Sequence, residues 1–171
     1  VEAAPEFLVF CADLSRPMRC CIEHGDSPSE GLTEHFIIAT VDAALYAQNV
    51  AVAAESAGLG ICYIGAIRNN AARSAELLDL PAQVYPVFGM CIGWPDQDPE
   101  VKPRLPVSVV LKENSYSIDG EAEAIAAYDE EMRTYYATRS ANIKIQGWSE
   151  QMAGLLGKES RLHMRPFLES K

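Results

Sequence analysis

Two cations stand two residues apart in the segment Lys102–Pro103–Arg104–Leu105–Pro106. Each proline lacks a backbone donor and keeps its predecessor out of the helical region, so we expect an extended segment. Side chains at positions i and i+2 of an extended segment point the same way, about 6.5–7 Å apart. Lys102 and Arg104 could therefore bind one phosphate, arginine as a fork and lysine as a point charge. The alternative is a pair of solvated cations that balance Asp98 and Glu100.

A glycine turn is the second candidate site. The stretch Tyr63–Ile64–Gly65–Ala66–Ile67–Arg68–Asn69–Asn70 joins the end of a short apolar strand to the start of a helix. Glycine lets backbone N–H groups approach a planar ligand or an anion closely. One glycine alone is neither a dinucleotide-binding fingerprint nor a P-loop. An ordinary strand-to-helix turn remains the alternative.

A third cation, Arg139, follows a predicted amphipathic helix and stands between Thr138 and Ser140. Asn142 and Lys144 come shortly after it. An arginine among small polar residues can bind a phosphate. The alternative is a solvated surface loop.

Residues for self-sufficient catalysis are absent from the sequence. No GxSxG or CxxC motif occurs, and the three histidines are scattered, so we assign no catalytic residue and no metal ligand. Asp42 and Glu55 lie on one predicted helix, either as a carboxylate pair or as satisfied interior carboxylates. The chain therefore either borrows a cofactor or does no catalysis.

The elements that must position these residues alternate between strands and helices, which indicates an α/β or α+β fold. Apolar β-branched runs predict strands, and 3.6-residue periodicity with capping residues predicts helices. The predicted strands cover residues 7–11, 60–65, 84–93 and 107–111, and the predicted helices cover 33–57, 70–78, 121–136 and 148–156. The polar segment from Ser15 to Gly31 is predicted to be a loop. We place a domain boundary after residue 112, with residues 1–112 as the core and 113–171 as a helical extension.

The helix expected from about Thr33 to Ala57 is rich in alanine and poor in polar residues. Thr33 is a plausible N-cap, and Gly58 ends the helix. Its polar residues are too few for a solvated face, so we expect burial nearly all round, in a large core or against a second subunit.

Composition narrows the classes of function. The 171 residues carry a formal net charge of −10, which disfavours nucleic acid and anionic membrane surfaces as partners. Polar residues interrupt the apolar runs well before the roughly 18 residues of a membrane span. Five cysteines occur without the spacing of a disulfide framework, which points to the cytoplasm: Cys11, Cys20, Cys21, Cys62 and Cys91.

A series of motifs in order along the chain resembles the oxygen-insensitive NADPH nitroreductase and NADPH–flavin oxidoreductase family. The matching stretches cover residues 4–13, 41–49, 54–60, 63–65, 68–70, 88–95, 102–106, 113–116, 128–130, 135–139, 148–149 and 158–161. Each motif is modest by itself, but together they span nearly the whole chain.

The resemblance implies an α+β fold in which an antiparallel-type mixed sheet packs on a long central helix, within an intertwined homodimer. It also implies FMN at the subunit interface and NADPH as reductant, with nitroaromatics, quinones or free flavin reduced by a ping-pong mechanism. Matching positions then acquire roles. Tyr63, Ile64, Gly65 and Ala66 would lie against the flavin ring, Lys102 and Arg104 on the FMN phosphate, Arg139 on the adenosine phosphate of NADPH, and Arg161 or Arg165 near the nicotinamide.

The sequence departs from the family pattern in three places. The chain begins after the family's opening segment, which carries further FMN-binding residues. Ala66 stands where relatives often have a second glycine, and the segment from Ser15 to Gly31 is not recognisable. The alternative function is therefore a catalytically incompetent dimeric fragment or remnant that no longer retains FMN; an interaction module built on the apolar helix is a third reading.

Overall fold

The computed structural model describes residues 2–139, 143–158 and 160–171. The chain divides into two compact units. Unit 1 comprises Val1–Asp96 with Arg161–Lys171, and unit 2 comprises Gln97–Ser160. The domain boundary expected after residue 112 stays a prediction.

Unit 1 is built on a three-stranded antiparallel sheet in the order β1–β3–β2. The strands are β1 (Glu6–Asp13), β2 (Gly60–Ile64) and β3 (Val84–Gly93). Three of the predicted strands are thereby confirmed. The central strand β3 is the most buried of the three, as its run of apolar residues predicts.

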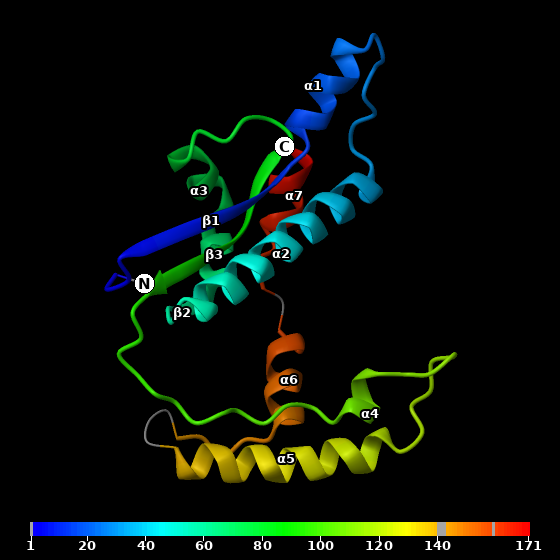
Figure 1. Cartoon of the computed structure of the whole chain (residues 1–171). Helices are drawn as coiled ribbons and strands as arrows, with labels where there is room; N and C mark the ends of the chain where they lie inside the picture. The colour runs from blue at the N-terminus through cyan, green and yellow to red at the C-terminus, as the bar shows by residue number, and fades with distance from the viewer. Residues whose placement is uncertain (1, 140–142, 159) are drawn as a thin grey trace. The chain divides into compact units, whose positions relative to one another are not determined.

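Helix α2 (Thr33–Ser56) covers one face of this sheet (Figure 1). Ala47 and Ala51 of α2 pack against Phe10 of β1 and Met90 of β3. Small side chains let the helix approach the strands closely. The helix begins after Leu32, so Thr33 is its first residue and not its N-cap.

Within the single chain α2 is buried on one side only, where it meets the sheet, so burial of its other side against a second subunit stays a prediction. Its buried residues form a single stripe: Ala39, Ala43, Ala47, Ala51 and Ala54. Asp42 and Glu55 are exposed, so neither is an interior carboxylate. By length and composition α2 is apolar enough to span a membrane, a criterion that the core helix of a soluble protein also meets. Its polar residues therefore do not by themselves exclude a span.

Two segments differ from the predicted secondary structure. Part of the predicted loop from Ser15 to Gly31 is helix α1 (Ser15–Glu23). The Asp13 carboxylate accepts hydrogen bonds from the backbone N–H of Ser15 at 2.9 Å and from its hydroxyl at 2.6 Å, which stabilises the helix start. Pro17 lies in the first turn, where a missing N–H costs little.

The predicted strand over residues 107–111 is a single helical turn, α4 (Val107–Val110). Its closing hydrogen bond runs from Leu111 N–H to the Val107 carbonyl at 2.8 Å. Valine favours strands through packing against neighbouring strands, and the described part of unit 2 contains none. The β-branched run therefore does not decide the conformation here.

Unit 2 is otherwise helical, with α5 (Glu121–Thr138) and α6 (Trp148–Leu156) as predicted. Tyr128, Met132 and Tyr136 of α5 form its buried core, against which Leu105 and Trp148 pack. These three side chains are spaced four residues apart and so lie on one helix face.

Shorter helices complete unit 1. The 3₁₀ helix η1 (Gly65–Asn70) leads into α3 (Ala71–Leu77), where the Asn70 side chain accepts from Arg73 N–H at 3.1 Å, as its capping role predicts. Helix α7 (Met164–Glu169), near the chain's C-terminal end in Figure 1, was not predicted from the sequence. Phe167 and Leu168 of α7 pack on the end of the sheet core.

Candidate functional site

The Gly65 turn lies where β2 passes into η1, as predicted. Tyr63, two residues earlier, points toward α2: its hydroxyl donates to Gln48 Oε1 at 3.3 Å, and its ring meets Phe88 edge-on at 5.4 Å between centroids. Ile64 is half-buried, whereas Ala66 is exposed. Tyr63 therefore anchors the strand end and leaves the turn itself accessible.

Arg161 lies at this turn although it is 96 residues away in sequence. Its Nε donates to Asn69 Oδ1 at 3.0 Å, and its Nη2 lies 3.5 Å from the Gly65 carbonyl oxygen. The backbone of Arg161 has a φ of 56°, a left-handed conformation that is uncommon outside glycine. Arg165 instead pairs with Glu169 at 2.9 Å on the exposed side of α7. Of the two candidate arginines, Arg161 is the one beside Gly65.

A second arginine, Arg68, lies within the candidate turn segment, but the sequence assigned it no role. Its Nη1 donates to the Val87 carbonyl of β3 at 2.5 Å, and its Nη2 would lie 3.1 Å from a Cβ placed on Gly65. Burial, together with the nearby charge of Arg161, lowers the pKa of Arg68. The carbonyl oxygen of Arg68 in turn lies 2.8 Å from Nε2 of His163. The turn thus presents two guanidinium groups, which donate hydrogen bonds and accept none.

Unit 2 holds the other predicted cations. The Lys102 Nζ lies 5.7 Å from the centroid of the Tyr136 ring, and the Arg139 guanidinium lies 5.7 Å from the same centroid and 5.4 Å from that of Tyr135. Lys144 Nζ lies 5.5 Å from the Tyr136 centroid. These distances are typical of cation–π contacts. We call Lys102, Arg139 and Lys144 the Tyr136 cation cluster.

The Tyr136 cation cluster changes the pKa of the Tyr136 hydroxyl. Tyr136 is 5% exposed. Burial opposes ionisation of its hydroxyl, but a hydrogen bond from Lys102 and the charges of Lys102 and Lys144 outweigh burial and lower its pKa. The cations therefore make ionisation of the Tyr136 hydroxyl easier than burial alone would allow.

The Lys102–Pro106 segment is held on α5 by its backbone. The Tyr128 hydroxyl donates to the Pro103 carbonyl at 3.0 Å, and Leu105 packs in the α5 core. Arg104 is exposed and makes no hydrogen bond or ion pair with any residue that the structure describes. The shared direction of Lys102 and Arg104 stays a prediction. Ser140, Asn142 and Glu159, which belong to the same sequence motifs, lie outside the described residues.

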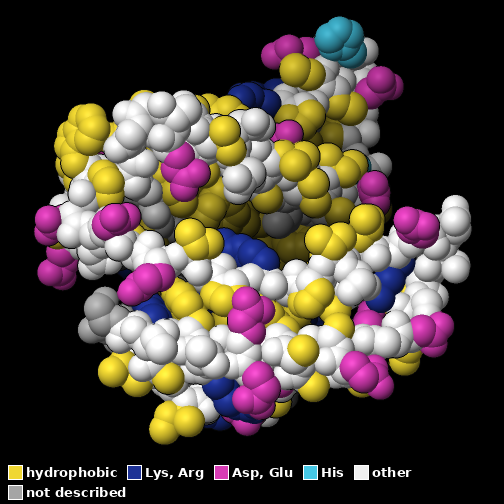
Figure 2. All heavy atoms as spheres, turned by 60° about the horizontal axis from the view of Figure 1, so that its bottom comes forward, with side chains coloured by type: hydrophobic (Ala, Val, Ile, Leu, Met, Phe, Trp, Pro, Cys, Tyr) yellow, Lys and Arg dark blue, Asp and Glu magenta, His cyan; other side chains and the backbone are white. Residues whose placement is uncertain are grey.

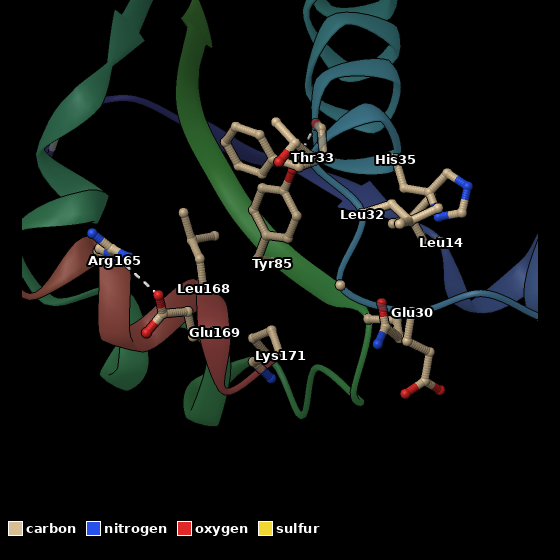
Figure 3. A pocket seen from close by; sticks show the side chains of 13 residues that line it. Leu14, Glu30, Leu32, Thr33, His35, Tyr85, Arg165, Leu168, Glu169 and Lys171 are labelled. Carbon is tan, nitrogen blue, oxygen red and sulfur yellow. Dashed lines mark hydrogen bonds and ion pairs between the residues drawn. The ribbon is translucent and has the colours of Figure 1, made fainter.

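The chain carries ten more acidic than basic side chains. Figure 2 shows acidic side chains scattered over one face, with hydrophobic side chains exposed among them. A hollow of about 680 Å³ lies elsewhere in unit 1, between the start of α2, the start of β3 and α7 (Figure 3). Its floor includes Tyr85, whose hydroxyl lies 2.7 Å from Thr40 Oγ1. Gly65 and Arg161 are not part of its lining.

Two family descriptions match the sequence of this chain. Residues 22–94 match the Nitroreductase family, and residues 102–171 match the C-terminal domain of the Nitroreductase family. Together with the end-to-end relatives described next, these matches show that the chain belongs to the nitroreductase family.

The chain is 47% identical over 171 residues to the NADPH-flavin oxidoreductase of Vibrio harveyi, covering 100% of this chain and 69% of the relative. It is 43% identical over 171 residues to the oxygen-insensitive NADPH nitroreductase of Salmonella typhimurium, with the same coverage. Among solved structures, NfrA1 nitroreductase from B. subtilis matches with a TM-score of 0.90 at 38% identity, over 98% of this chain and 70% of that one. The predicted family and its α+β fold are confirmed.

Proposed function

We propose that this chain is an FMN-dependent oxidoreductase that uses NADPH to reduce nitroaromatics, quinones or free flavin. The observation that carries the proposal is the meeting of Arg161 with the Gly65 turn. It brings together two separated motifs of a chain that is 47% identical to an NADPH-flavin oxidoreductase. A relative at 39% identity is an FMN reductase (NADPH) of Bacillus subtilis, which supports FMN as the flavin.

The donor set around Gly65 fits a flavin ring. The ring system offers carbonyl oxygens and ring nitrogens as acceptors, and Arg68 and Arg161 offer only donors. A Cβ on Gly65 would meet Arg68 Nη2 at 3.1 Å, so the glycine leaves room at the turn. The cations Lys102 and Arg104 suit the doubly charged FMN phosphate, for which an acidic chain needs a local positive patch.

Each group then has one task. Tyr63, Ile64, Gly65 and Ala66 would lie along the flavin ring, with Arg161 oriented there by Asn69. Lys102 and Arg104 would bind the FMN phosphate. Arg139 would bind the adenosine phosphate that distinguishes NADPH from NADH. We assign no catalytic side chain, because these residues bind and orient.

Bound FMN supplies hydride and electron-transfer chemistry that amino-acid side chains lack. We propose a ping-pong order, in which NADPH and the acceptor would use one place in turn, so that NADP⁺ leaves before the acceptor binds. Few side chains would need to recognise the acceptor, because its position beside the flavin would be enough for reduction. We therefore expect a broad range of acceptors.

We further propose that the chain works as a homodimer. The side of α2 away from the sheet exposes an apolar stripe at helical spacing, formed by Ile38, Val41, Leu45 and Val52. Exposed apolar stripes of this kind mark interfaces. A second copy covering this stripe would give α2 the burial on both sides that its composition predicts.

We also propose that the protein is cytoplasmic and binds neither nucleic acid nor membranes.

The test is NADPH oxidation by the purified chain supplied with FMN and a quinone, followed by absorbance. We expect a rate above that of FMN and NADPH without protein. A rate equal to that of free FMN would overturn the proposal. It would favour the alternative, a dimeric remnant without FMN.

The Arg139→Ala variant tests coenzyme choice. Loss of a charge-assisted hydrogen bond, about 1.5–3 kcal/mol, should raise the KM for NADPH by about 10- to 150-fold and leave FMN content unaltered. Arg165→Ala is the matched control, because that arginine is paired on the exposed side of α7. An equal rise of KM with NADH would argue against contact with the extra phosphate.

A further inference from the structure

Two cysteines face each other across the edge of the sheet. Cys62 of β2 and Cys91 of β3 are directly opposite partners in the antiparallel register. Met90 and Ile92, which flank Cys91 on β3, pack toward α2. Because side chains alternate along a strand, Cys91 and its partner Cys62 point to the other face of the sheet.

The register alone brings the two residues within reach of a covalent bond. Directly opposite residues of an antiparallel pair have Cα atoms about 4.5–5.5 Å apart, depending on their hydrogen-bonding position. Disulfides span Cα separations of about 4.4–6.8 Å. The Cβ atoms of such pairs are about 4.5–5.5 Å apart, slightly wider than a relaxed disulfide prefers, so a small closure of the strands is needed.

The two thiols differ in access to solvent. Cys62 is exposed, with its Sγ 3.8 Å from the Tyr63 carbonyl oxygen. Cys91 is 8% exposed and lies between Cys62 and Phe7, its partner on β1. A soluble oxidant therefore meets Cys62 first, and Cys91 is placed to react next. Exposure and an adjacent second thiol are the marks of a redox-responsive pair.

We propose that Cys62 and Cys91 form a reversible intramolecular disulfide when the protein meets a peroxide. In the first step the Cys62 sulfur attacks one peroxide oxygen: the O–O bond breaks, an S–O bond forms, and water leaves. In the second step the Cys91 sulfur attacks the sulfur of the resulting sulfenic acid, the S–O bond breaks, and a second water leaves. The two thiols lose two protons and two electrons in all, and hydrogen peroxide is reduced to two waters.

The bond ties the edge strand β2 to the central strand β3 just before the Gly65 turn. Because cross-strand geometry requires closure of the strands, the disulfide is expected to be readily reduced by a dithiol. The inference does not rest on the proposed function, since neither thiol is assigned to flavin or NADPH and the test uses no flavin.

The test treats the reduced full chain with hydrogen peroxide, alkylates the remaining thiols and maps disulfides by mass spectrometry. Digestion after arginine and after glutamate separates Cys62 from Cys20 and Cys21, because Glu55 lies between them. We expect one linked peptide pair, containing Cys62 and Cys91, two hydrogen atoms lighter than the reduced peptides. Dithiothreitol should restore both free thiols.

Single-cysteine variants separate the steps. Cys91→Ala should abolish the linked peptide and leave Cys62 as a sulfenic acid that dimedone traps, and Cys62→Ala should leave Cys91 unoxidised. Cys20→Ser and Cys21→Ser are the controls and should leave the linked pair unchanged. A chain linked through Cys62 to a second chain, or Cys62 oxidised while Cys91 stays alkylatable in the wild type, would overturn the proposal.

Discussion

Asp129 is a buried carboxylate that joins the two main helices of unit 2. It is 7% exposed, and it accepts hydrogen bonds from Ser149 N–H at 2.8 Å and from the Ser149 hydroxyl. The Ser149 side chain is the main cause of the lowered pKa of Asp129, against the opposing effect of burial. The carboxylate of α5 thus satisfies free N–H groups at the start of α6, as a capping residue does.

The Asp129→Asn variant should lose about 1–3 kcal/mol of stability at pH 7, because a charged acceptor is replaced by a neutral one. A folded pKa below the unfolded one stabilises the protein above the unfolded pKa, near 4, and this contribution fades as pH falls through the folded pKa. Urea unfolding should therefore show a gap between wild type and variant that narrows below about pH 4. Glu131→Gln, on the exposed side of α5, is the control. A gap independent of pH would contradict this account.

Lys102→Ala and Arg104→Ala should each weaken FMN binding by about 1.5–3 kcal/mol, the contribution of one charge-assisted hydrogen bond. Quenching of FMN fluorescence on titration with the chain measures the affinity. Arg73→Ala removes an equal charge from an exposed ion pair with Glu76 and should leave affinity unchanged. Unchanged affinity in both test variants would refute the phosphate role.

Sequence reasoning found the candidate residues that stand in recognisable local patterns, such as Gly65 between a strand and a helix. It gave no role to Arg68 or Asn69 in that segment, because their contacts with Val87 and Arg161 join distant parts of the chain. The choice between Arg161 and Arg165 was likewise open in the sequence. Only the folded backbone decides which of them reaches Gly65.

At the scale of elements, two glycines of α6 differ in the space around them: Gly147 at its N-cap and Gly154 within it. A Cβ on Gly147, at the N-cap, would lie 2.7 Å from Asp129 Oδ1, whereas a Cβ on Gly154, within the helix, would meet nothing within 4 Å. The first glycine is needed for close approach of α5, and the second only adds backbone freedom.

Gly154→Ala should therefore stabilise the chain by about 0.5–1 kcal/mol through helix propensity. Gly147→Ala should destabilise it, because the new methyl group displaces the Asp129 carboxylate from Ser149. Thermal unfolding of the two variants beside the wild type measures both effects. Equal shifts in the same direction would show that the α5–α6 contact does not control stability.

Helices and strands were predictable where the apolar pattern and the turn-forming residues at its ends indicate the same element. Strand β3 matches its predicted range, since a continuous apolar run is bounded by turn residues. Helix α1 was missed because Pro17 reads as a helix breaker although it lies in the first turn. The single turn α4 was mistaken for a strand because propensity carries no information on whether a partner strand exists.

At the scale of the whole molecule, the exposed stripe of α2 is the feature that the chain by itself leaves unexplained. Leu45 within it is 62% exposed, close to the 65% of Leu77 on α3. The two leucines have the same hydrophobicity and similar exposure. A dimer through α2 would bury Leu45 and leave Leu77 exposed, so Leu45 is the test position and Leu77 is the control.

Leu45→Lys should convert the proposed dimer to a monomer. Loss of about 1.5–3 kcal/mol of apolar burial in each of two copies should raise the dimer Kd on the order of a thousandfold. Sedimentation velocity over a range of concentrations measures the change, and Leu77→Lys should leave the dimer intact. Dissociation by both variants, or by neither, would argue against an interface on this stripe.

The central claim is that this chain binds FMN. The most direct measurement is a visible absorbance spectrum of the purified chain after loading with FMN and desalting. We predict a retained flavin band that corresponds to one FMN per chain. A colourless protein would contradict the claim and would leave a nitroreductase-family fold that does not retain its cofactor.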